Sequence, residues 1–177
     1  MENTNTLWGN IFKPESDSGS ASRMSVLKKI PLFAGLSRRE LGRVSDIIHE
    51  REYERGEAVF LMDQPGAAFF IVMEGELDII VPQDGADPLK LATIGEGLSV
   101  GELALLDASP RSASAVASKK TRALAFFRED LHKLLESEPF IGSKIYRTLS
   151  TIIGARLRAT NAQLQKLTEK NGNAKNL

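Results

Sequence analysis

The sequence of 177 residues contains no cysteine and only two histidines. Disulfides, thiolate metal sites and cysteine nucleophiles are therefore excluded, as is usual for proteins of a reducing cytoplasm. The histidines, His49 and His132, do not form the cluster with carboxylates that a metal-dependent enzyme built on a small barrel would need. No Ser-His pair, P-loop or paired-carboxylate motif is apparent. We therefore predict that the chain is not an enzyme and holds no metal or cofactor.

An excess of charge and long hydrophobic runs are also absent. Lys plus Arg and Asp plus Glu both number 23, so no net field attracts the chain to nucleic acid or to an anionic membrane. No apolar run approaches the length of about 20 residues that spans a bilayer. The first 22 residues lack the apolar core of a signal peptide. We expect one soluble cytoplasmic domain with no nucleic-acid or membrane partner.

Residues 1–22 are rich in Asn, Ser, Gly and Thr, a composition that predicts a flexible N-terminal arm. Trp8, Ile11 and Phe12 interrupt this polarity. A tail docked lightly on the domain is the simpler interpretation, and a peptide that binds a partner is the alternative.

A helix is predicted to follow this arm. Ser37 and Glu40 have the spacing of a capping box, and the apolar residues after them repeat at helical intervals as far as His49. From about 52 to 127 the sequence changes to short apolar or alternating runs separated by glycines. Such runs predict an antiparallel β jelly-roll barrel. The candidate strands are 58–62, 69–74, 76–81, 89–94, 113–117 and 122–127.

The helical period returns after Arg128. A short helix contains leucines at 131, 134 and 135, and a long helix is predicted to begin near Pro139 and to extend to about 170. The fold class is therefore mainly β with flanking helices. Residues 23–137 form the helix and barrel, 138–170 the long helix, and 171–177 a tail, which leaves no room for a second domain.

The long helix has a nearly heptad pattern of side chains at 149, 153, 157, 160, 164 and 167. A helix of this length leaves the barrel too far to be covered by it entirely. We expect a second copy to cover it in a homodimer, and a helix that folds back on its own barrel is the alternative.

Residues 97–116 stand between two strand patterns where a barrel needs only a short turn. Gly101 permits close backbone approach, and 102–107 have room for a short helix whose free N–H groups attract an anion. Arg111 adds a guanidinium fork for two phosphate oxygens, and Ser112 adds a hydroxyl donor. Glu102 would repel a phosphate but would accept a bond from a ligand hydroxyl. A phosphate and a ribose hydroxyl together indicate a nucleotide.

The sequences Gly-Glu-Leu-Ala-Leu at 101–105 and Pro-Arg-Ser-Ala at 110–113 resemble the phosphate-binding cassette of the cyclic nucleotide-binding domain family. The resemblance covers about 25–168, including the order of helix, barrel and helix. Val100 departs from the aromatic residue usual before Gly-Glu, and Ala67 replaces a frequent acidic residue. Neither change removes a phosphate ligand.

The resemblance implies a role for each matching residue. The cyclic phosphate would be held by Gly101, Arg111, Ser112 and the backbone N–H groups of Leu103, Ala104 and Ala113. Glu102 would hold the ribose 2′-hydroxyl, and apolar contacts with sugar and base would come from Ile79, Leu91 and Ile94. The long helix resembles the dimer helix of this family's transcription activators, which implies that Thr160 and Asn161 contact the base. An ordinary polar position in the seam remains the alternative for these two.

The sequence therefore predicts a sensor or regulatory module that binds cAMP, possibly cGMP, and acts on an unknown downstream protein. It predicts no specific DNA binding, because no recognition helix follows the long helix. The alternative is a dimerisation or interaction module of the same fold that binds nucleotide weakly or not at all.

Overall fold

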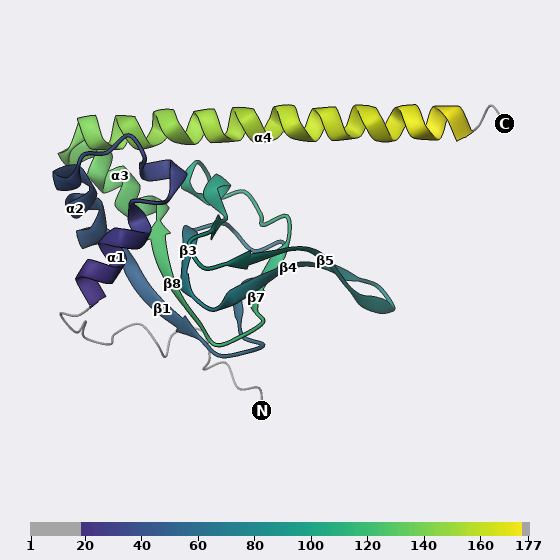
Figure 1. Cartoon of the computed structure of the whole chain (residues 1–177), viewed down its shortest axis with the longest axis horizontal. Coiled ribbons are helices and arrows are strands. Elements are labelled where there is room, and N and C mark those ends of the chain that lie inside the picture. The colour runs from purple at the N-terminus through teal and green to yellow at the C-terminus, as the bar shows by residue number, and fades with distance from the viewer. Residues whose placement is uncertain (1–18, 175–177) are drawn as a thin grey trace.

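The computed structural model describes residues 19–174 and consists of two β-sheets with helices on one side (Figure 1). Every strand pairing is antiparallel. In chain order the elements are α1 Gly19–Leu27, η1 Pro31–Phe33, α2 Arg38–Ile47, β1 His49–Tyr53, β2 Ala58–Phe60, β3 Ala68–Glu74, β4 Glu76–Gln83, β5 Ala86–Gly95, β6 Ser99–Val100, η2 Glu102–Leu105, β7 Ser114–Ala117, β8 Thr121–Phe127, α3 Arg128–Ser137 and α4 Pro139–Ala174.

The strands form two separate four-stranded sheets in the orders β1-β8-β3-β6 and β2-β7-β4-β5. The sheets are not joined edge to edge into a closed barrel, but their arrangement is jelly-roll-like, and the predicted fold class is confirmed. The hairpin of β4 and β5 projects away from the sheets, and α4 extends well beyond them (Figure 1). Among the described residues, no helix is long and apolar enough to cross a membrane.

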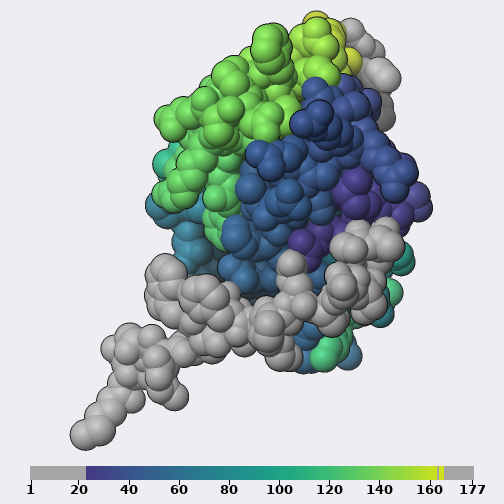
Figure 2. Space-filling model, turned by 90° about the vertical axis from the view of Figure 1, so that its left-hand side faces the viewer, coloured from purple at the N-terminus to yellow at the C-terminus, as the bar shows by residue number. Residues whose placement is uncertain are grey.

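Strand β3 is buried on both faces because it separates two apolar clusters. Phe69 and Ile71 belong to the larger cluster beneath the helices, which also contains side chains of α2, β8, α3 and α4. Phe70 and Val72 point the other way and pack toward β2, β4 and β6. Figure 2 shows the helical face, where α2 lies beside α3 and the beginning of α4. The alternation of a strand thus positions both the helices and the opposite sheet around one central element.

Most predicted elements are present, with shifted ends. The capping box of Ser37 and Glu40 is present in both directions. Helix α1 begins at Gly19, inside the range expected to be an arm, and α4 continues through Ala174, into the expected tail. Trp8, Ile11 and Phe12 lie outside the described residues. Strands β1 and β6 were not predicted, because β1 is mostly charged and β6 has only two residues.

Candidate functional site

The segment between β6 and β7 begins with a backbone turn that only glycine accommodates well. Gly101 has a φ of 83° in the left-handed region and precedes η2. A Cβ atom at this position would lie 2.5 Å from Nη1 of Arg111. Gly101 therefore allows the arginine to lie directly against the backbone, the close approach that the sequence predicts.

Arg111 is buried and held in one place by its surroundings. Its Nη2 donates to the carbonyl oxygen of Ala68 at 2.6 Å and its Nη1 to that of Gly101 at 3.3 Å. The guanidinium carbon lies 4.0 Å from the centre of the Phe60 ring, a cation–π contact. Burial lowers the pKa of Arg111 below its usual value, and the neighbouring Glu102 carboxylate partly offsets this. The protein therefore stabilises a desolvated cation at the end of the space between the sheets.

The guanidinium of Arg111 keeps donors for a further acceptor. Its Nε is buried and makes no hydrogen bond within the described part of the chain. Buried polar groups are rarely left unpaired without a functional reason. An anionic ligand with several oxygens fits this donor set.

Glu102 is the second buried charge of the segment, with 5 % of its surface exposed. Its Oε1 forms an ion pair with Nη1 of Arg156, which reaches it from α4. The Arg156 side chain is itself 62 % exposed. The carboxylate predicted to hold a ribose hydroxyl is thus also the point at which α4 contacts the cassette.

The remaining predicted contacts are three apolar side chains on β4 and β5 and several donors in the cassette. Ile79 and Ile94 are half-buried on adjacent strands, and the register places Ile79 opposite Ala92 of β5 and Ala115 of β7. Leu91 is 56 % exposed. Ala113 is buried, Ser112 and Leu103 are exposed, and the N–H of Ala104 donates to the Gly101 carbonyl at 3.1 Å. The structure therefore brings Gly101, Glu102 and Arg111 together, while one predicted backbone donor already has an internal acceptor.

Thr160 and Asn161 are both exposed on α4, one helical turn beyond Arg156. Arg156, rather than Thr160, is the residue of this helix that contacts Glu102. A role of Thr160 and Asn161 at the base stays a prediction.

Sequence reasoning did not identify two side chains of the site. Phe60 lies under Arg111 although many residues separate them, because β2 pairs with β7. The apolar run at 58–62 indicated a strand but not a cation–π partner. The only sequence signal for Arg156 was its place in the predicted dimer helix.

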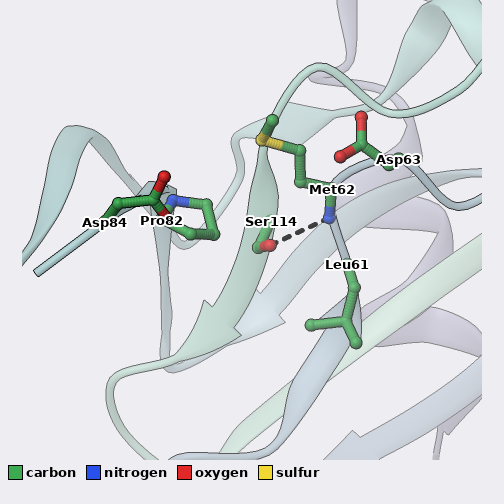
Figure 3. Close-up of a pocket in the computed structure, with 6 residues that line it drawn as sticks. All are labelled: Leu61, Met62, Asp63, Pro82, Asp84 and Ser114. Carbon is green, nitrogen blue, oxygen red and sulfur yellow. Dashed lines mark hydrogen bonds between the residues drawn. The ribbon is translucent and has the colours of Figure 1, made fainter.

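A depression of about 510 Å³ is lined by residues of the segment after β2, of β4 and the turn after it, and of β7 (Figure 3). The Ser114 hydroxyl accepts a hydrogen bond from the Met62 N–H at 2.9 Å, and the Asp63 N–H donates to the Arg111 carbonyl at 2.9 Å. The carboxylates of Asp63 and Asp84 line this depression and would repel a phosphate. This depression is therefore less suited to an anion than the cassette is. The residues that line the depression are Leu61, Met62, Asp63, Pro82, Asp84 and Ser114.

Comparisons with known proteins agree with this geometry. The model of the family described as "Cyclic nucleotide-binding domain" matches residues 50–138. The cyclic AMP receptor protein of Thermus thermophilus is 33% identical over 142 residues, which are 80% of this chain and 64% of that protein. The cAMP-dependent protein kinase regulatory subunit of Mycosarcoma maydis is 38% identical over 95 residues, 54% of this chain and 18% of that one. The chain thus spans less than two thirds of these relatives.

A solved structure shows the same arrangement of elements. The cyclic nucleotide-binding domain from Methylobacillus flagellatus has a TM-score of 0.70 and 26% sequence identity, and the match covers 84% of each chain. The matched region of the family model contains both Glu102 and Arg111. On the family model, the relatives and the fold together, this chain belongs to the cyclic nucleotide-binding domain family.

Proposed function

We propose that the chain is a regulatory module that binds a cyclic nucleotide, with cAMP favoured over cGMP. The observation that carries this proposal is the buried Arg111, which is anchored on two backbone carbonyls and lies beside the buried Glu102. A cation and a carboxylate held side by side suit a ligand that carries both a phosphate and a hydroxyl.

Arg111 holds the cyclic phosphate in this proposal. The contacts with Ala68, Gly101 and Phe60 fix the plane of the guanidinium before ligand arrives, which reduces the entropy lost on binding. The exposed Ser112 hydroxyl and the backbone N–H groups of Leu103 and Ala113 supply further donors. The N–H of Ala104 would have to share its present bond with Gly101 to join them.

Glu102 accepts the ribose 2′-hydroxyl. Its Oε1 is engaged by Arg156, and its second oxygen has lone pairs for a ligand hydroxyl. Arg156 therefore connects the ribose position to α4. Ile79, Leu91 and Ile94 pack against the sugar and base, and Thr160 and Asn161 offer an acceptor to the exocyclic amine of adenine.

The signal leaves through α4, which joins a second copy along 145–167 and acts on a downstream protein in the cytoplasm. In this proposal the module acts on a protein and not on DNA. The relatives named for cAMP reception and for kinase regulation support a regulatory role for the same domain in this chain.

Isothermal titration calorimetry with cAMP, cGMP and cyclic dinucleotides tests this proposal directly. Charge-assisted hydrogen bonds contribute roughly 1.5–3 kcal/mol, so Arg111→Ala should weaken cAMP binding by about 10-fold to 150-fold. Arg111→Lys should also lose affinity. An ammonium cannot bond the two carbonyls, stack on Phe60 and bind the phosphate at the same time. Arg43→Ala, which removes only an exposed ion pair with Glu138, is the control and should bind as wild type does.

The second candidate function is a dimerisation or interaction module that binds nucleotide weakly or not at all. The ion pair between Glu102 and Arg156 favours it, since this contact closes the cassette without a ligand. A wild-type chain that gives no heat with any cyclic nucleotide, or equal affinity in wild type and Arg111→Ala, would select this function over cyclic nucleotide binding at the cassette.

A further inference from the structure

Arg128 lies outside the predicted ligand contacts but touches the cassette at two points. It is the first residue of α3, directly after β8. Its Nη1 donates to the Ala104 carbonyl at 3.2 Å and also to the Asp107 carbonyl. These two oxygens are in and just after η2, so the arginine bonds the end of the segment whose beginning holds Gly101 and Glu102.

The same nitrogen reaches the loop between β2 and β3. It donates to the Gly66 carbonyl at 2.7 Å, and the Arg128 N–H donates to the Ala67 carbonyl at 2.9 Å. Gly66 lies so close to η2 that an added Cβ would be 2.8 Å from the Cβ of Ala104. Arg128 therefore joins two segments that are in direct contact and stand next to the carbonyl of Ala68, on which Arg111 is anchored.

Arg128 stands at the start of α3, and α3 packs against the long helix α4. Burial raises the pKa of Tyr146 on α4, and the positive charge of Arg128 opposes that rise. Helices α3 and α4 pack closely, as a Cβ added at Gly142 would lie only 2.7 Å from the Cα of Leu135.

We propose that Arg128 is a positioning residue that clamps the end of the cassette to the β2–β3 loop and to α3. By holding Ala104 and Asp107, it keeps Glu102 and Arg111 in the geometry that binds nucleotide. The effect on nucleotide affinity rests on the function proposed above, whereas the effect on the cassette exists without ligand.

Hydrogen exchange and calorimetry on the full chain test this role with three variants. Without nucleotide, Arg128→Gln should speed amide exchange in 101–109 by about tenfold or more, because the clamp no longer resists local opening. It should weaken cAMP binding by about tenfold although it does not contact the ligand. Arg128→Lys should lie between Gln and wild type in both measurements, since an ammonium bonds some of the same carbonyls.

Arg122→Gln is the matched control. Arg122 is on β8, the strand that leads to Arg128, and its guanidinium donates to two oxygens, Oε1 of Glu50 and Oε2 of Glu74. These bonds reach neither the cassette nor the β2–β3 loop. This variant should leave exchange in 101–109 and cAMP affinity as in wild type. If exchange in 101–109 and cAMP affinity change in Arg128→Gln but not in Arg122→Gln, the effect is due to the clamp and not to a general loss of stability.

Wild-type affinity or wild-type exchange at 101–109 in Arg128→Gln would overturn the proposal, as would equal effects of Arg122→Gln. If Arg128→Gln does not fold, Arg128→Lys decides by the same criteria. A wild-type chain that binds no cyclic nucleotide would contradict the proposed function, and in that case faster exchange in Arg128→Gln alone would still support the clamp.

Discussion

The conformation of Gly101 links the backbone of the cassette to its charged side chain. Its positive φ would cost any other residue about 1–2 kcal/mol. The position carries a second constraint, because a methyl group there would overlap Nη1 of Arg111. The first constraint affects stability alone, whereas the second displaces the residue that is proposed to hold the phosphate.

Gly101→Ala and Gly97→Ala separate these two effects. Gly97 has a similar φ of 76°, but an added Cβ there meets no atom within 4 Å. Both variants should lose about 1–2 kcal/mol of unfolding free energy in urea. Only Gly101→Ala should also weaken cAMP binding, by about tenfold or more, because Arg111 must move. Equal cAMP affinity in the two variants would show that Arg111 does not depend on this close approach.

Residue spacing predicted Glu102 and Arg111 as neighbours in space, and the structure places both buried in the cassette. Local spacing was sufficient because one short loop contains both residues. Phe60 and Arg156 were not identified, since their contacts depend on the pairing of β2 with β7 and on the rotation of α4. Neither the strand pairing nor the helix rotation can be inferred from the periodicity of a single sequence.

At the scale of elements, Glu40 connects α2 to α4. Lys144 Nζ donates to both of its carboxylate oxygens, at 2.7 and 2.9 Å, and the Ser37 N–H donates to Oε2 at 2.7 Å. These bonds, with the Lys144 bond the largest contribution, lower the pKa of Glu40 from 4.5 to about 2. A carboxylate with a lowered pKa in the folded state stabilises the fold above its unfolded pKa.

Glu40→Gln should therefore lower the melting temperature at pH 7, and its difference from wild type should shrink as the pH falls from 4.5 toward 2. Scanning calorimetry at several pH values measures both quantities. Glu138→Gln is the control, because its partner Arg43 is 58 % exposed, and its effect at pH 7 should be smaller. A difference between Glu40→Gln and wild type that stays constant down to pH 2 would contradict this assignment.

The middle of α4 is the element on which nucleotide selectivity depends in the proposed function. Thr160 and Asn161 follow Arg156, the partner of Glu102, by about one turn, and both are exposed. At the same edge of the base, adenine offers an amine donor and guanine an oxygen acceptor. The Thr160 hydroxyl or the Asn161 amide can rotate to form a hydrogen bond with either group. The expected preference for cAMP is therefore about one hydrogen bond, up to about tenfold.

Replacing Thr160 and Asn161 together by alanine should remove most of the preference for cAMP over cGMP and leave phosphate binding intact. The double variant of Ser150 and Thr151 to alanine is the control, since these exposed hydroxyls bond only carbonyls of their own helix, at Tyr146 and Arg147. Calorimetry with both nucleotides gives the ratio. A full preference in the Thr160 and Asn161 variant would mean that the base is recognised elsewhere.

Element types were predictable where a strong period or a cap was present, as at Ser37 before α2 and along α4. Strand β1 was not, because its sequence HEREY is largely charged and its pairing with β8 is a tertiary effect. The short η2 was expected as a helix over 102–107 and is a 3-10 helix that ends at Leu105. The close approach of Gly66 to Ala104 of this helix could not be inferred from residue types alone.

At the scale of the whole molecule, the feature that most needs a partner is the end of α4. From Ala155 onward, every side chain that the structure describes on this helix is exposed. Leu157 and Leu164, one heptad apart, are 59% and 56% exposed. Isolated helices are marginally stable in water, and an apolar stripe at heptad spacing is the surface on which two such helices pair. These observations favour the predicted homodimer along 145–167.

Light scattering at tens of micromolar tests the dimer with substitutions that leave the helix length unchanged. Leu157→Glu combined with Leu164→Glu should convert the dimer to a monomer, because two copies would place four carboxylates in one apolar seam. Phe140→Glu is the matched control: Phe140 is 86% exposed on the same helix but lies before 145, so the dimer should persist. A wild-type monomer, with and without cAMP, would contradict the prediction, and so would loss of the dimer in Phe140→Glu alone. If the dimer forms only with cAMP, its dissociation constant should fall as cAMP is added, because a ligand that binds one assembly state better stabilises that state.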